Sequence, residues 1–115
     1  MNPDIGILDK YIKELGLILA KHGIDQILIF GSRNSGTFRD TSDLDLIVLN
    51  PSSIDLKNWA LLKIDIEESL IPILIDIQKS SSVSERFLKN IFATGTVWKI
   101  SPNGNFEKAD RPFKN

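Results

Sequence analysis

Residues 31–48 read GSRNSGTFRDTSDLDLIV, and this stretch decides how the chain folds. A short apolar run at residues 27–30 precedes it, and a second apolar run at residues 44–49 ends it. Continuous apolar runs of this length, bounded by turn residues, are typical of buried strands. The stretch therefore predicts two strands joined by a polar turn, with a Gly-Ser pair after the first and a D-x-D pattern at the head of the second.

Asp43 and Asp45 form the D-x-D pattern. Because strand side chains alternate between faces, both carboxylates point the same way, roughly 6–7 Å apart along the strand. Leu44 and Leu46 then point to the core. Two carboxylates so placed repel each other unless a cation lies between them, and Mg²⁺ readily takes oxygen ligands of this kind. A solvated strand end, capped by Ser42, is the alternative for these two residues.

Gly31 and Ser32 follow the first strand directly, as the residues of a phosphate-binding turn do. Glycine allows backbone N–H groups to approach an anion, and the hydroxyl of Ser32 adds a donor. Gly36 is a second flexible point, while Arg33 and Arg39 offer cations to phosphates. The same residues also fit an ordinary glycine-rich turn with solvated arginines.

Asp76 lies inside a third apolar run, IPILIDIQ, at residues 71–78. We expect a strand over residues 73–78, opened by Pro72, where proline is tolerated. A carboxylate between Ile75 and Ile77 is costly to bury unless it is paired or bound to a metal. If its face of the strand is solvated, as Gln78 allows, no partner is required.

The rest of the chain alternates helices and strands. Asn2 and Pro3 are expected to open a first helix that ends at Gly23, and Ser52 or Ser53 a second that runs to about residue 70. Ser82 or Ser84 starts a third that ends at Gly95, with a strand at residues 96–100. The buried side of the third helix is expected to hold Phe87, Leu88, Ile91 and Phe92. This alternation predicts an α/β layered domain.

Length and composition indicate one globular domain. The 115 residues include 42% hydrophobic and 25% charged residues, which is ordinary for a soluble domain. We place the domain at residues 1–100 and expect residues 101–115, SPNGNFEKADRPFKN, to be a loosely ordered tail because they are polar and aperiodic.

Several classes of protein are excluded by composition. The absence of cysteine excludes disulfides and thiolate metal sites, and a single histidine excludes a multi-histidine zinc site. A net charge of -1 offers no general attraction to a nucleic-acid template. Without an export signal or an apolar run long enough to span a membrane, we expect a cytoplasmic protein.

The ordered set GSRNSG, SDLDL and LIDI resembles the nucleotidyltransferase superfamily that includes DNA polymerase beta and kanamycin nucleotidyltransferase. In that family a strand, a G-S pair and a further glycine precede D-x-D, and a third aspartate follows on a later strand. The short length, the GSR opening and the segment ERFLKNIFATGTVWKI look most like the minimal nucleotidyltransferases (MNT). The resemblance covers nearly all of residues 5–100.

The resemblance implies the α/β (α+β) nucleotidyltransferase fold, a mixed and twisted sheet flanked by helices. It implies that Gly31 and Ser32 hold the triphosphate of ATP or another NTP, and that Asp43 and Asp45 bind two Mg²⁺ ions. Asp76 would complete the second metal site and help to deprotonate the attacking hydroxyl. Such chemistry depends on positioning and on charge neutralisation.

The implied reaction transfers NMP, such as AMP from ATP, to a hydroxyl group. Minimal members pair with small helical HEPN proteins and can act as antitoxins that adenylylate them, so a partner protein is the expected acceptor. A partner surface or a second copy of the chain would then complete the acceptor site. Transfer to a small molecule such as an antibiotic, which normally needs an added substrate domain, is one alternative. A nucleotide-binding antitoxin without turnover is the other.

Overall fold

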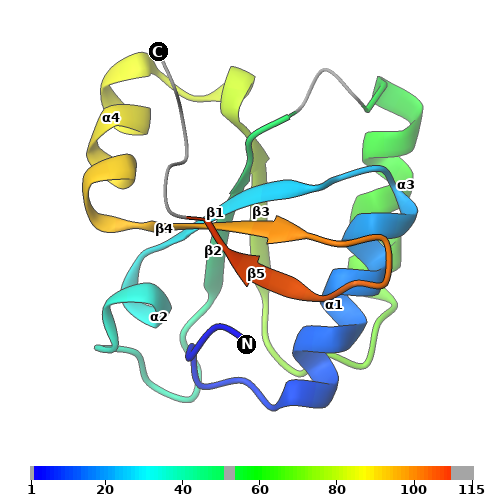
Figure 1. Ribbon diagram of the computed structural model, residues 1–115, viewed down its shortest axis with the longest axis horizontal. Coiled ribbons are helices and arrows are strands. Elements are labelled where there is room, and N and C mark those ends of the chain that lie inside the picture. Colours follow the sequence, from blue (N-terminus) through cyan, green and yellow to red (C-terminus); the bar gives the residue numbers. More distant parts are fainter. Residues whose placement is uncertain (1, 51–53, 110–115) are drawn as a thin grey trace.

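A computed structural model describes residues 2–50 and 54–109 of the chain. Within these residues, five strands form one mixed sheet in the order β3-β2-β1-β4-β5, with helices on both sides (Figure 1). The strands are β1 Gln26–Phe30, β2 Leu44–Val48, β3 Ile75–Lys79, β4 Thr96–Ile100 and β5 Phe106–Lys108. The helices are α1 Asp9–Lys21, α2 Ser32–Ser35, α3 Leu56–Glu67 and α4 Glu85–Thr94, with a 3₁₀ turn at Ser80–Ser82. The expected single α/β (α+β) domain with a mixed sheet is confirmed.

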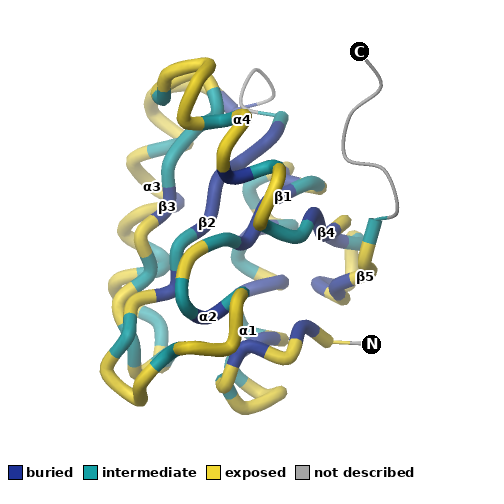
Figure 2. The backbone as a smooth tube through the Cα atoms, turned by 90° about the vertical axis from the view of Figure 1, so that its left-hand side faces the viewer, coloured by how far each residue is buried: buried dark blue, intermediate teal, exposed yellow. Residues whose placement is uncertain are grey.

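Helices α1 and α3 cover one face of the sheet, whereas α2 and α4 lie on the other (Figures 1 and 2). Side chains along β2 point alternately to these two faces, so the buried residues form one cluster on each face of the sheet. Leu44 and Leu46 pack in the larger cluster with residues of α1 and α3, and Ile47 packs with Ile91 of α4 in the smaller one. Asp45, between Leu44 and Leu46, therefore belongs to the α4 face.

Strand direction explains the connections. β1 pairs antiparallel with both β2 and β4, while β2 pairs parallel with β3. A parallel pair needs a crossover connection, which α3 supplies between β2 and β3. β3 is left at one edge of the sheet.

The predicted strands at residues 27–30, 44–49 and 96–100 are confirmed to within one residue. α4 also begins and ends as expected, because the Ser84 hydroxyl accepts a hydrogen bond from the backbone N–H of Phe87 at 3.1 Å and Gly95 follows its last residue. The strand predicted at residues 73–78 begins only at Ile75, so Pro72 lies before it.

Two helix starts were predicted wrongly. α1 begins at Asp9, because Gly6 adopts a positive φ of 74° and the segment before it packs against the domain, with Pro3 and Ile5 buried. α3 is capped by Asp55, whose carboxylate accepts a hydrogen bond from the N–H of Asn58 at 2.8 Å. The predicted caps at residues 52 and 53 lie outside the described residues.

The prediction of a loose tail is wrong for residues 101–109. β5 pairs antiparallel with β4, and the buried Phe106 meets Trp98 edge to face at 6.2 Å. The segment looks polar because β5 is an edge strand with a single buried residue. Residues 110–115 lie outside the described part. No helix within residues 2–50 or 54–109 is long and apolar enough to cross a membrane.

Candidate functional site

The predicted carboxylates meet where β1 ends and β2 begins. Asp45 pairs in register with Phe30 of β1 on one side and with Asp76 of β3 on the other. Neighbouring strands lie about 4.8 Å apart, and residues in register project from the same face. Asp43 immediately precedes β2 and is exposed. The structure therefore brings the third aspartate beside the D-x-D pattern.

Negative charge is concentrated around Asp45. Partial burial raises the pKa of Asp45, and the nearby charges of Asp76 and Asp43 raise it further. Each of these effects opposes ionisation. The raised pKa of Asp45 therefore reflects both its partial burial and its closeness to the other two carboxylates.

Asp76 belongs to this group for a different reason from the one expected. It is exposed, and its neighbour Leu74 on the same side of the strand is 75% exposed, because β3 is an edge strand. Asp76 therefore has no burial cost that a metal or a partner would have to offset. What connects Asp76 with the site is its register opposite Asp45.

The Gly-Ser turn lies directly against Asp45. Gly31 has a φ of 79°, and a Cβ atom added there would stand 2.5 Å from Oδ2 of Asp45. Glycine is therefore required both for the backbone conformation and for the space that the carboxylate fills. Ser32 opens the short helix α2, whose first N–H groups have no preceding helical carbonyl, and Gly36 ends it with a φ of 85°.

Arg33, which was predicted to contact phosphate, instead lies inside the protein, with 1% of its surface exposed. Its guanidinium donates to the carbonyl oxygens of Ile5 at 2.8 Å, Ser42 at 2.9 Å and Asp40 at 3.1 Å, and it lies over the ring of Phe38. This guanidinium holds the N-terminal segment and the loop before Asp43 against α2. The prediction that Arg33 binds the nucleotide is wrong.

Arg39 lies in that same loop and is exposed. Its backbone N–H donates to the hydroxyl of Ser42 at 2.8 Å, but its guanidinium forms no ion pair with any residue that the structure describes. Arg39 is thus the cation of this turn that remains available to an anionic ligand.

An aromatic pair that the sequence did not indicate borders the carboxylates. Phe30, the cross-strand neighbour of Asp45, meets Phe87 of α4 edge to face, with ring centroids 5.7 Å apart. Phe87 was expected to be buried but is 37% exposed. Helical periodicity assigned it to the apolar side of α4 correctly but cannot distinguish the centre of a core from its rim.

The donor atoms suit a hard divalent cation. Asp43, Asp45 and Asp76 offer only carboxylate oxygens, the ligands that Mg²⁺ prefers, and a cation among them would relieve the repulsion that raises the pKa of Asp45. As the side chains stand, no three His, Cys, Asp or Glu residues in the described ranges are close enough together to hold an ion. Binding would therefore draw exposed carboxylates inward.

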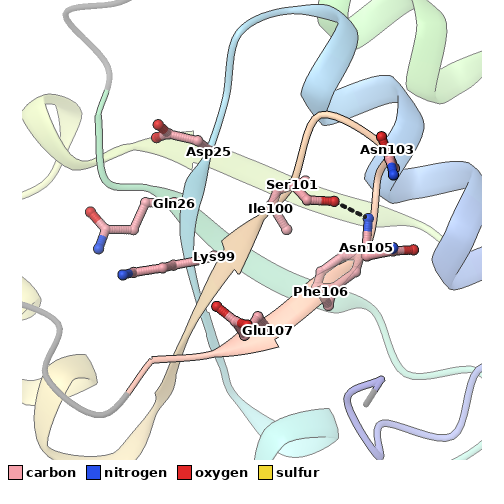
Figure 3. Close-up of a pocket in the computed structure, with 9 residues that line it drawn as sticks. All are labelled: Asp25, Gln26, Lys99, Ile100, Ser101, Asn103, Asn105, Phe106 and Glu107. Carbon is pink, nitrogen blue, oxygen red and sulfur yellow. Dashed lines mark hydrogen bonds between the residues drawn. The ribbon is translucent and has the colours of Figure 1, made fainter.

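A cavity of about 720 Å³ lies elsewhere, at the opposite end of the sheet (Figure 3). Its lining includes Gln26, which starts β1, and Lys99 and Glu107, which face each other across β4 and β5. Gly31 and the aspartates lie at the other end of β1, where Asp45 is in register with Phe30. This cavity does not contribute to the carboxylate site.

Comparison with known proteins identifies a family for most of the chain. The family model described as "Polymerase beta, Nucleotidyltransferase" matches residues 13–100, which is well over half of the sequence and spans β1 to β4. No curated protein matches the chain.

Proposed function

The chain belongs to the polymerase beta-like nucleotidyltransferase family, and on that premise we propose that it transfers a nucleoside monophosphate from an NTP to a hydroxyl group with the help of Mg²⁺. The observation that supports this proposal is the register that sets Asp76 opposite Asp45, with Asp43 just before β2 and the Gly-Ser turn directly against Asp45. The nucleotide that we propose is ATP, which would donate AMP.

Each residue of the site has a distinct task in this proposal. The acceptor oxygen attacks the α-phosphorus, the bond from that phosphorus to the bridging oxygen of pyrophosphate breaks, and the hydroxyl proton passes to Asp76. The turn at Gly31 and Ser32 and the guanidinium of Arg39 bind the triphosphate. Mg²⁺ held by the aspartates would neutralise charge on the phosphates. The exposed part of the Phe87 ring receives the base by stacking, because an aromatic face can stack with any base.

We propose a protein as the acceptor, namely a small helical HEPN-type partner that the chain adenylylates as the antitoxin of the pair. The openness of the site supports this choice. Asp43 and Asp76 are exposed rather than enclosed, so a hydroxyl carried on a partner's surface can approach them. A small free alcohol would find few walls to orient it beside the α-phosphate.

The first experiment measures ATP binding by calorimetry with Mg²⁺ and with EDTA. Because three carboxylates repel a triphosphate until cations intervene, binding should strengthen at least tenfold with Mg²⁺ in the wild-type protein. Asp45→Asn should lose most of this gain. Asp25→Asn, at the far end of β1 in the cavity of Figure 3, is a matched control that should retain it. Equal binding with and without Mg²⁺ would contradict the proposed site.

The second experiment identifies the acceptor. The chain, ATP and Mg²⁺ are incubated with the purified product of the adjacent gene, and both proteins are followed by intact-mass analysis. A gain of AMP units on the partner that Asp43→Asn abolishes would support protein adenylylation. Efficient modification of an aminoglycoside by the chain alone would favour the small-molecule enzyme. A tight complex without any transfer would identify a binding subunit.

A further inference from the structure

The outward side of α3 is apolar, although nothing in the described structure covers it. Leu62 is the fully buried residue of this helix, and Trp59 and Ile66 pack beside it against the core. With 100° of rotation per residue, the opposite side of the helix is centred on Ile64. That residue is 45% exposed, and Leu61 next to it is 42% exposed. An amphipathic helix would carry polar residues at both positions.

Charges flank these apolar residues with opposite signs at the two ends of the helix. Lys57 lies seven residues, or nearly two turns, before Ile64 and so occupies the same side of α3. Glu67 and Glu68 lie three and four residues after Ile64, again on that side. All three charged residues are exposed. Neither salt bridge of the described residues involves any of them.

We propose that this surface, made of Lys57, Ala60, Leu61, Ile64, Glu67 and Glu68, binds the same surface of a second copy of the chain, with the two α3 helices antiparallel. A two-fold axis that crosses the exposed side of α3, level with the midpoint between residues 62 and 63 along the helix, places Ile64 of one copy against Ala60 and Leu61 of the other. The same operation places Lys57 opposite Glu67 and Glu68 at both ends of the contact. Such self-complementarity is what a two-fold symmetric interface requires.

The arrangement of charged and apolar residues on α3 favours a second copy of the chain as the binding partner. A parallel pairing of the helices would place like charges together at each end, whereas the antiparallel pairing joins opposite charges twice. One exposed leucine at each end of α3 adds apolar surface to the proposed contact. Leu56, the first residue of the helix, is 80% exposed, and Leu70, just beyond its last residue, is 79% exposed. Their sequence positions lie almost symmetrically about the proposed axis.

This contact lies on the side of the sheet opposite the carboxylates. α3 packs on the face formed by Leu44 and Leu46, while Asp45 belongs to the face of α4. Pairing through α3 leaves both carboxylate sites open and cannot carry a hydroxyl of one copy into the site of the other. The dimer and the proposed transfer reaction are therefore independent, and each can fail without the other.

The strength of the pairing follows from its size. α3 has 12 residues, so a contact confined mainly to this helix is small compared with standard protein interfaces. We expect a dissociation constant on the order of 10–100 μM. Sedimentation velocity over a range of about 5–500 μM should show the wild-type protein changing from monomer to dimer.

Charge reversal tests the register. Lys57→Glu should weaken the dimer about tenfold, because two attractions become two repulsions. The double change Glu67→Lys and Glu68→Lys should weaken it similarly. Combining all three substitutions should restore it to within about threefold of the wild type, since opposite charges again face each other. All of these positions are exposed, so thermal unfolding should show folded proteins throughout.

Lys89→Glu is the matched control, because it reverses the same charge at an exposed position of α4, on the other face of the sheet. It should leave the dimer unchanged. A protein that stays monomeric up to the highest concentration would overturn the proposal and leave this surface to a different chain. A dimer that resists Lys57→Glu, or that the combined substitutions fail to restore, would also overturn it.

Discussion

Replacing Arg33 with methionine separates a structural role from nucleotide binding at the same residue. Methionine fills much of the space of the buried side chain but donates no hydrogen bonds. The substitution therefore removes the donors to Ile5, Ser42 and Asp40, which lie in two segments on either side of α2. We expect a large loss of stability from a residue whose position in the sequence suggested ligand binding.

The magnitude follows from the three shortest of these hydrogen bonds. At about 1 kcal/mol net for each, their loss lowers the free energy of unfolding by about 3 kcal/mol. The free energy of unfolding of a native protein is only about 5–15 kcal/mol, so this loss is a substantial fraction of the total stability. For a domain of this size it corresponds to a fall in Tm of roughly 12 °C.

Urea unfolding followed by circular dichroism measures the change, and calorimetry with Mg²⁺ and ATP at low temperature measures binding by the molecules that remain folded. Arg39→Gln is the matched control, because Arg39 is exposed in the same loop. It should change stability by less than about 0.5 kcal/mol but weaken ATP binding. If Arg33→Met unfolded like the wild type and instead weakened ATP binding, Arg33 would be a ligand-binding residue rather than a structural one.

Three further predictions follow from the geometry and the charges of the domain. Burial and neighbouring carboxylates raise the pKa of Asp45 above its ordinary value of 3.8. The contribution of Asp45 to the free energy of unfolding is therefore complete only below pH 3.8 and is lost as the pH rises through the raised pKa. In urea titrations Asp45→Asn should therefore gain stability relative to the wild type between about pH 3 and pH 7, while transfer falls about a hundredfold or more. The hydrogen bond between His22 and Asp65 lowers the pKa of Asp65. The stability that Asp65 contributes is therefore present above its ordinary pKa of 3.8 and is lost as the pH falls through the lowered pKa. Asp65→Asn should accordingly destabilise at neutral pH, and thermal melts should show its difference from the wild type vanishing in strong acid. Gly31→Ala and Gly36→Ala should each cost about 1–2 kcal/mol in chemical denaturation because both positions have positive φ. Radiolabel transfer assays should show a collapse only for Gly31→Ala, whose new Cβ would collide with Asp45, since no atom lies within 4 Å of a Cβ added at Gly36.

The local elements and the identity of the chemical groups could be predicted from the amino-acid sequence. The apolar runs of β1 and β2, the Ser84 cap and the stop of α4 at Gly95 were predictable because each depends on a few consecutive residues. The side-chain period of two also placed Asp45 on the face opposite Leu44 and Leu46. The order of Gly-Ser, D-x-D and a later aspartate was sufficient to indicate the family.

How those groups are positioned depends on contacts between distant parts of the chain. Asp76 is in register with Asp45 because β3 pairs parallel with β2, and it is exposed because β3 is an edge strand. Arg33 is buried because its acceptors come from two separate segments, one of them 28 residues away at Ile5. β5 forms because Phe106 finds Trp98 on a neighbouring strand. Such pairings join residues that are distant along the chain, and neither periodicity nor turn chemistry contains information over that range.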